Sequence, residues 1–143
     1  MKLSREALEA LTAHVLEGYP FEACGVLVGR QSAGAAHVDE AVRMLNREAE
    51  QPRVRYQIAP EDLLRLQREA LASGRDILGF YHSHPDHPAR PSETDRRVAA
   101  GGLSDGVIHM VVGVAGGKET TPSAWVFRDT LQGFEPEPLE IGD

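Results

Sequence analysis

The sequence predicts an α/β fold in which helices cover a single β-sheet. Amphipathic segments with helical periodicity alternate with short apolar segments that are typical of buried strands. The 143 residues, 41% of them hydrophobic, are enough for one core, and no repeat or linker divides them. This mixed order of elements is typical of one sheet with helices packed on it, so we expect a single domain over residues 1–143.

The first part of the chain predicts a helix followed by a hairpin. Apolar side chains recur at helical spacing over residues 4–17, and Gly18 ends the helix. The apolar segment 23–29 predicts a buried strand. A turn at 31–35 leads to a second strand over 36–44, which we expect to pair with the first.

The next segment predicts a loop, a short strand and a second helix. Residues 46–53 are polar and predict the loop, and residues 54–58 predict the strand. Pro60 lies in the first turn of the helix, where its missing N–H costs nothing, and Ser73-Gly74 ends the helix.

The second half predicts the central strand and its neighbours. Residues 76–82 predict that strand, and after a proline-rich loop Ser92 begins a helix that ends at Gly101-Gly102. Apolar segments at 107–114 and 124–127 predict further strands. Phe134 starts a last edge strand, and residues 136–143 predict a flexible tail.

Composition excludes several classes of protein. The net charge of −7 argues against a nucleic-acid-binding surface, which needs a basic stripe. No apolar run approaches the about 20 residues of a membrane span, and the acidic N-terminal helix is unlike a secretory signal. Cys24 is the single cysteine and has no partner for an internal disulfide. We therefore expect a cytoplasmic protein.

The most informative segment is HSHPDHPARPSETD, residues 82–95. His82 and His84 leave the same side of a strand, because side chains alternate between its faces. With Asp95 they make three side chains of the kinds that bind Zn²⁺, and a fourth position left for water is typical of catalytic zinc. The prolines between them stiffen the loop and reduce the entropy cost of bringing Asp95 to the metal.

A structural interpretation competes with the metal site. Ser92 and Asp95 also fit a capping box, in which the two side chains satisfy free N–H groups at the start of a helix. A His-x-His pair at the end of a strand is also found on ordinary surfaces. The combination of both halves at this spacing nevertheless favours a metal site.

Hydrolysis of an amide also needs a group that moves protons and does not bind the metal. Glu22 is the best candidate, because it precedes an apolar strand, where an acid is out of place unless it is paired or functional. An acid that merely caps the end of a strand is the alternative.

Together these residues resemble a known signature. Glu22 in the setting PxEACGxLVG, then His82-Ser83-His84-Pro85, six further residues, Ser92 and Asp95 resemble the JAMM (MPN-plus) metalloprotease family. The resemblance implies a cytidine-deaminase-like fold with a mixed sheet flanked by helices. It also implies one Zn²⁺ bound by the two histidines and the aspartate, with Glu22 as general base and Ser92 beside the oxyanion.

The resemblance also implies a class of substrate. Members of this family cut peptide or isopeptide bonds after the Gly-Gly tail of ubiquitin-like proteins. This short chain is most similar to the compact bacterial branch, which trims small sulfur-carrier proteins. A non-catalytic MPN-type scaffold and a zinc peptidase for an unrelated peptide remain as alternatives. The sequence does not indicate the carrier, the residues removed, an activating partner or the oligomeric state.

Other residues have weaker claims to function. Cys24 is a possible nucleophile, but a lone thiol in an apolar strand is usually a buried core residue. His87 is either a solvated loop residue or a contact for substrate or metal, and His109 is expected to be a satisfied histidine in a strand. A zinc deaminase would need a P-C-x-x-C segment, which one cysteine does not provide.

Overall fold

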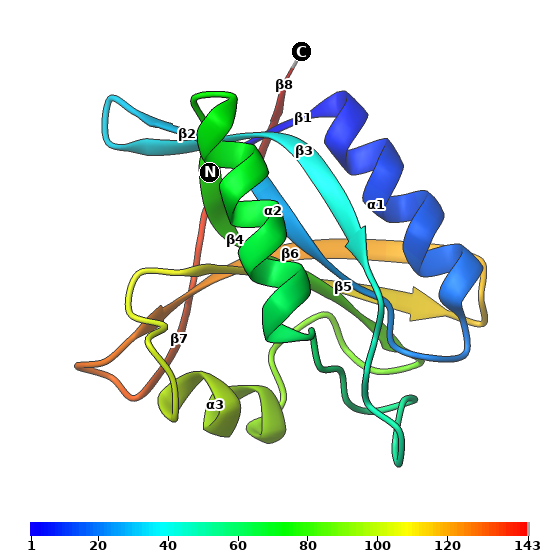
Figure 1. Ribbon diagram of the computed structural model, residues 1–143. Helices are drawn as coiled ribbons and strands as arrows, with labels where there is room; N and C mark the ends of the chain where they lie inside the picture. Colours follow the sequence, from blue (N-terminus) through cyan, green and yellow to red (C-terminus); the bar gives the residue numbers. More distant parts are fainter. Residues whose placement is uncertain (143) are drawn as a thin grey trace.

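A computed structural model describes residues 1–142. One eight-stranded sheet runs through them in the order β7-β6-β5-β4-β2-β3-β1-β8 (Figure 1). The strands are β1 Lys2–Ser4, β2 Cys24–Ser32, β3 Ala35–Met44, β4 Asp76–Pro85, β5 Ile108–Ala115, β6 Glu119–Arg128, β7 Gly133–Pro136 and β8 Glu140–Gly142. The helices are α1 Arg5–Gly18, α2 Pro60–Ala72 and α3 Glu93–Ala100.

The sheet is mixed, as expected. The pairs β4–β5, β1–β3 and β1–β8 are parallel, whereas β2 runs antiparallel to both of its neighbours, β3 and β4. The predicted hairpin of β2 and β3 and the central position of β4 are confirmed.

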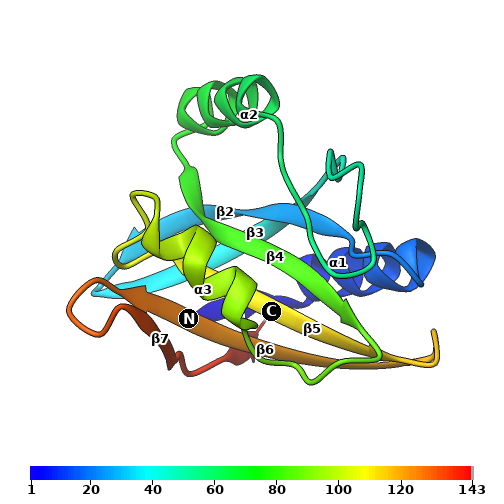
Figure 2. The same cartoon turned by 90° about the horizontal axis from the view of Figure 1, so that it is seen from below.

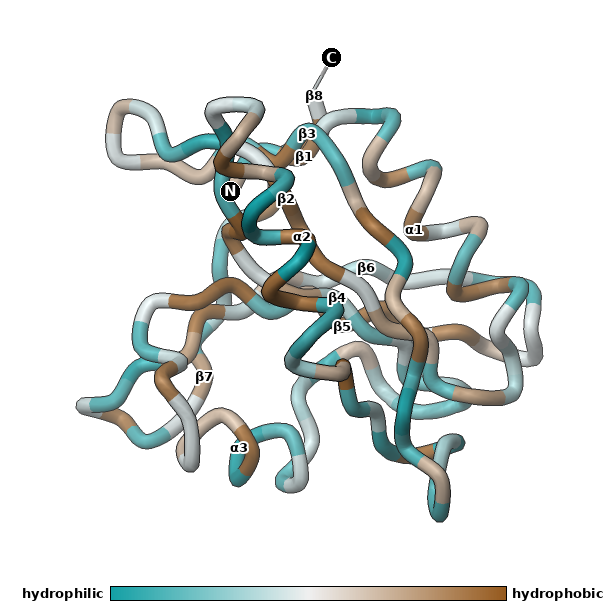
Figure 3. Tube along the Cα trace, viewed as in Figure 1, coloured by the Kyte–Doolittle hydropathy of each residue, from teal (hydrophilic) through white to brown (hydrophobic). Residues whose placement is uncertain are grey.

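The helices cover both faces of the sheet. On one face, α1 buries Leu11 and Val15 against Tyr81 of β4 and its neighbours. On the other face, α2 packs against Val26 and Phe80. Hydrophobic and hydrophilic residues alternate along α1 and α2, as amphipathic helices require (Figure 3). Because side chains alternate along β4, the face that carries Phe80 also carries the even-numbered residues that follow it.

The structure corrects two expectations. Residues 54–58 form a loop instead of a strand, because side-chain hydrogen bonds from Asn46 replace the strand ladder. Residues 140–142 of the predicted flexible tail form β8, which pairs with β1, while Asp143 lies outside the described residues. The N-terminal ammonium of Met1 anchors this segment through Glu137 and the carbonyl of Pro138. Strands of three residues are too short to show periodicity, so neither β1 nor β8 was expected.

No helix within residues 1–142 is long and apolar enough to cross a membrane.

Close packing between β2 and β4 gives a test of the fold. A Cβ atom added at Gly25 would lie 2.1 Å from Cε1 of Tyr81, whose ring is fully buried and whose hydroxyl bonds His14. We expect Gly25→Ala to reduce the free energy of unfolding by about 3 kcal/mol, the upper end of the range for overpacking. Urea denaturation checks this. The control Gly142→Ala meets no atom within 4 Å and should change stability by less than about 0.5 kcal/mol. Equal losses in both variants would contradict the packing.

Candidate active site

The site is built at the end of β4. His82 and His84 are only 1% and 5% exposed, and they leave the same face of the strand. Their Nε2 atoms lie 3.1 Å apart. The chain then turns back through a proline-rich loop to α3 (Figure 2). Asp95, in the first turn of α3, lies beside both histidines of β4.

Asp95 joins the two histidines through the start of α3. Its Oδ2 atom lies 3.1 Å from Nε2 of His82 and 3.1 Å from Nε2 of His84. The same oxygen accepts the backbone N–H of Ser92 at 2.8 Å, and the Asp95 N–H donates to Oγ of Ser92 at 3.0 Å. The capping box is therefore present together with the cluster of possible metal ligands.

The three donor atoms fit a zinc ion. Around a tetrahedral zinc with bonds of about 2.0–2.1 Å, the ligand atoms lie about 3.3–3.4 Å apart. The three separations here are each 3.1 Å. Nδ1 of His84 lies 2.9 Å from the carbonyl of Pro88, which only accepts, so Nδ1 carries a hydrogen. Neutral His84 then presents an unprotonated Nε2 to the centre of the triangle, as a metal ligand must.

At two of the three residues, the electrostatics favour the protonation state that binds a metal. Burial lowers the pKa of His82 despite its hydrogen bond with Asp95, so this imidazole is readily neutral. Burial by itself raises the pKa of Asp95, but hydrogen bonds with both histidines outweigh it and hold the pKa far below its usual range. Burial also lowers the pKa of His84, but hydrogen bonds with Asp95 and the Pro88 carbonyl outweigh it, so the pKa is raised. Protons therefore compete with a metal at His84.

Glu22 lies beside this cluster, just before β2. It is 4% exposed, and its Oε1 atom has no hydrogen-bond partner among the described residues. Burial raises its pKa to about 8, with a smaller contribution from the charge of Asp95 and against that of His84. The next residue, Ala23, is joined to β4 by two hydrogen bonds with Ser83. An unpaired buried carboxyl group costs stability, so its presence here indicates function.

A loop that the sequence did not single out closes the site. The Asn46 side-chain amide donates to the carbonyls of Glu22 and Arg55, and its oxygen accepts the N–H groups of Glu48 and Gln57. These bonds hold the loop, so that the Tyr56 ring stacks on the His82 ring at 4.6 Å. No helical or strand periodicity in the sequence marks Asn46 or Tyr56 as part of a site. The one indication in the sequence was that an asparagine and an aromatic residue occur within a polar segment.

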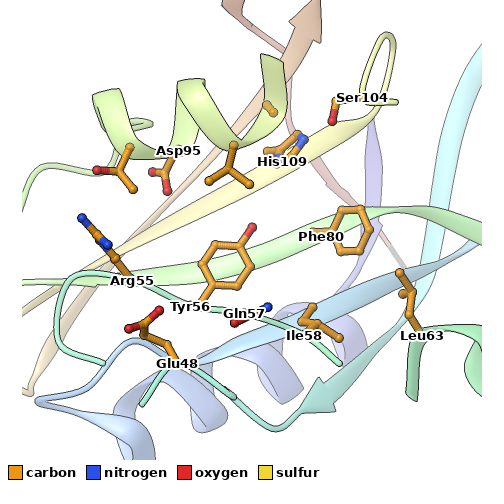
Figure 4. Close-up of a pocket in the computed structure, with 13 residues that line it drawn as sticks. Glu48, Arg55, Tyr56, Gln57, Ile58, Leu63, Phe80, Asp95, Ser104 and His109 are labelled. Carbon is orange, nitrogen blue, oxygen red and sulfur yellow. The ribbon is translucent and has the colours of Figure 1, made fainter. Parts of the chain in front are cut away.

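Two cavities lie beside the cluster. The first, which we call the Tyr56 cavity, has a volume of about 490 Å³. Arg55 and Glu48 lie at one end of it, and Phe80 and Leu63 lie at the other (Figure 4). Its remaining lining residues are Tyr56, Gln57, Ile58, Thr94, Asp95, Val98, Ala99, Ser104 and His109.

The second, which we call the Glu22 cavity, has a volume of about 340 Å³. It brings Glu22, His84 and Ser92 to one surface, and Arg55 and Thr94 line both cavities. Its other lining residues are Gln51, Val54, His87, Pro88, Arg90 and Pro91. The ligand cluster therefore has room on two sides, which suits a chain that passes across it.

The remaining candidates do not join the cluster. The thiol of Cys24 is fully buried, and burial raises its pKa to about 12, which disfavours the reactive thiolate. His87 is exposed and lines the Glu22 cavity. His109 lines the Tyr56 cavity, and its Nε2 has no hydrogen-bond partner among residues 1–142. The expectation that the hydrogen bonds of this histidine are satisfied is therefore wrong. Burial lowers its pKa to about 4.

Comparison with proteins of known sequence identifies relatives. A desampylase of Haloferax volcanii is 35% identical over 104 residues, which cover 70% of this chain and 73% of the relative. A CysO-cysteine peptidase of Mycobacterium tuberculosis is 31% identical over 94 residues, which cover 66% of this chain and 62% of the relative.

Solved structures have the same fold. The solution structure of a protein from Desulfitobacterium hafniense matches with a TM-score of 0.86 at 25% identity, covering 99% of this chain and 92% of that one. A crystal structure of a JAB1/MPN domain protein from Archaeoglobus fulgidus matches with a TM-score of 0.61 at 20% identity, covering 100% and 97%. The fold implied by the JAMM resemblance is thereby confirmed. The model of the Prok-JAB family matches residues 4–128, and the chain belongs to this family, the prokaryotic homologs of the JAB domain.

Proposed function

We propose that this protein is a zinc-dependent peptidase that hydrolyses the bond after the Gly-Gly tail of a small ubiquitin-like or sulfur-carrier protein. One observation supports this more than any other. Three ligand atoms lie 3.1 Å apart at the edge of a cavity that also holds a buried, unpartnered carboxyl group. A structural cluster would need no such carboxyl group.

His82, His84 and Asp95 would hold the metal. Zinc in such a site supplies Lewis acidity, which lowers the pKa of water and polarises a carbonyl group. The chain orients two of these ligands by secondary hydrogen bonds, from His84 to the Pro88 carbonyl and from the Ser92 N–H to Asp95. Such bonds hold the donor atoms in place before the metal arrives.

Glu22 would move the proton. It takes a proton from the attacking water and delivers it to the leaving amine, which requires a pKa near the working pH. Burial gives Glu22 this property, because it raises the pKa to about 8 in the metal-free protein. The Glu22 N–H donates to the Pro52 carbonyl at 2.7 Å, and the Glu22 carbonyl accepts Asn46, so the backbone is held on both sides of the carboxyl group.

Ser92 would bind the oxyanion. Its Oγ atom already accepts the Asp95 N–H, so its own hydrogen is available for a second partner. The residue lines the same cavity as Glu22. A donor placed in advance where negative charge develops stabilises the transition state.

The relatives support the choice of substrate. One is named a desampylase and the other a CysO-cysteine peptidase. A non-catalytic scaffold would have no need of a complete ligand set, and a peptidase for unrelated peptides is the remaining alternative. The cytoplasmic location expected from the sequence stays a prediction.

Metal analysis tests the ligand set. We expect about one zinc ion per chain in the wild-type protein, removed by a chelator. We expect His82→Ala and Asp95→Ala to lose the metal, because each removes one of three ligands. His37→Ala, in β3 and outside the cluster, is the control and should keep it. Retention of zinc by both ligand variants would refute the assignment.

Kinetics test the role of Glu22. We expect Glu22→Gln to retain zinc and to cleave a carrier with residues after Gly-Gly about 10²–10⁴-fold more slowly, which is the usual contribution of a general base. Mass spectrometry of the carrier follows the reaction. The exposed Glu69→Gln in α2 should cleave at the wild-type rate. Full activity of Glu22→Gln would remove this residue from the mechanism.

The raised pKa of Glu22 also predicts how stability depends on pH in the chelator-treated protein. Folding raises this pKa from 4.5 to about 8, so folding favours the neutral acid. The Glu22 contribution is fully present below pH 4.5 and is lost as the pH rises through about 8.

Glutamine stays neutral, so Glu22→Gln should gain stability relative to wild type across this window by up to about 1.4 kcal/mol per pH unit. The gain should level off at higher pH. Urea denaturation of both proteins at a series of pH values measures the difference. A difference that stays constant with pH would show that the carboxyl group does not titrate in this way.

A further inference from the structure

The Glu22 cavity carries two cationic side chains without partners. Arg55 and Arg90 line it, and neither guanidinium has an ion pair or a side-chain hydrogen bond in the described part of the chain. Other arginines of this acidic protein do form such pairs, for example Arg75 with Asp39 and Arg96 with Glu93. Glu22 is the one carboxyl group on the wall of this cavity among residues 1–142. The cavity is therefore suited to an anionic group.

The backbone around Arg90 is held firmly. Asp86 accepts hydrogen bonds from the Tyr19 hydroxyl at 2.6 Å and from the Gly116 N–H at 2.8 Å. The Ala89 carbonyl accepts the Ser123 hydroxyl at 2.7 Å. The Pro88 carbonyl accepts both the Arg90 N–H and His84. A cation on a fixed segment loses less entropy when it binds an anion.

The backbone of Arg55 is tied to that of Glu22. One Asn46 side-chain nitrogen donates to the carbonyls of both residues at 3.0 Å. Two hydrogen bonds thus fix the backbone of Arg55 relative to that of Glu22. The distance of Arg55 from Glu22 is important because, in the proposed reaction, the leaving group departs beside Glu22.

The chemistry places the leaving group in the same cavity, if the proposed function holds. Water adds its oxygen to the carbonyl carbon of the last glycine, the C–N bond breaks, and the nitrogen takes a proton from Glu22. The leaving nitrogen therefore lies on the Glu22 side of the metal ligands. When the residue removed is the last of its chain, its α-carboxylate is two bonds from that nitrogen.

We propose that Arg90, assisted by Arg55, binds the α-carboxylate of the residue released, so that the enzyme selects carriers with a short C-terminal extension. Arginine is well suited to this task, because its planar donors match a carboxylate. A lysine side chain in an isopeptide bond offers no carboxylate at this distance. The cavity of about 340 Å³ is at the small end of ligand pockets, as a short extension requires. This inference rests on the proposed function and names the leaving group of that same site.

Two peptides test the inference. Both carry acetyl-Ala-Ala-Gly-Gly-Ala, one with a free C-terminal carboxylate and the other with a carboxamide. We expect the zinc-loaded wild-type enzyme to cleave the carboxylate peptide with a kcat/KM about tenfold higher, the gain of a partly exposed charged hydrogen bond. We expect Arg90→Gln to lose this preference, so that the ratio of its kcat/KM values for the two peptides falls to about one.

Further variants separate charge from structure. Arg90→Lys should restore part of the preference, because it keeps the charge without the planar fork. Arg55→Gln should reduce the preference, and the control Arg68→Gln, in α2 and outside both cavities, should leave it intact. High salt should weaken the preference in the wild-type enzyme.

Binding to the metal-free protein distinguishes failure of the inference from failure of the proposed function. NMR titration with the two peptides measures this binding without any turnover. Tighter binding of the carboxylate peptide, lost in Arg90→Gln, supports the inference even if the zinc-loaded enzyme cleaves neither the peptides nor a carrier with residues after Gly-Gly, and the proposed function then fails alone. Equal cleavage of both peptides overturns the inference and leaves the peptidase activity standing. No cleavage of the peptides or of the carrier, together with no selective binding, overturns both.

Discussion

The carboxylate of Asp95 is the group on which the rest of the site depends. One of its oxygens lies 3.1 Å from both buried imidazoles and also accepts the backbone N–H of Ser92, the residue that caps the start of α3. The carboxylate thus joins the end of β4 to the start of α3 across a proline-rich loop. Two buried histidines without this acid would be polar groups with poor compensation, which is costly in a protein interior. The fold of the loop and the chemistry of the site therefore rest on the same interaction.

Around this acid the protein builds a site whose polar groups are held from several directions. His84 is oriented by the Pro88 carbonyl, and His82 is covered by the Tyr56 ring. Asn46 holds the covering loop and the backbone of Glu22 at the same time. His82 and Glu22 are positioned by residues far away in the chain, so the arrangement depends on the tertiary structure and not on the motif alone.

The two cavities on either side of the ligand cluster differ in the chemistry of their lining residues. The Tyr56 cavity has an apolar end with Phe80 and Leu63, whereas the Glu22 cavity has Arg55 and Arg90 and a single carboxyl group. A substrate that crosses the ligand cluster meets different chemistry on its two sides. Glu22, the residue proposed to transfer the proton, lies on the cationic side, and under that proposal the leaving part of the substrate lies there too. This asymmetry connects the fold to the choice of substrate.

The sequence by itself determined those features that depend on neighbouring residues. Helical and strand periodicities predicted α1, α2 and the central strands, and close spacing predicted His82, His84, Ser92 and Asp95 as one group. Tertiary structure alone decided how Glu22, Asn46 and Tyr56 meet this group, since contacts between distant segments leave no periodic pattern. It also decided the pairing of the short strands β1 and β8, whose stability comes from their neighbours in the sheet.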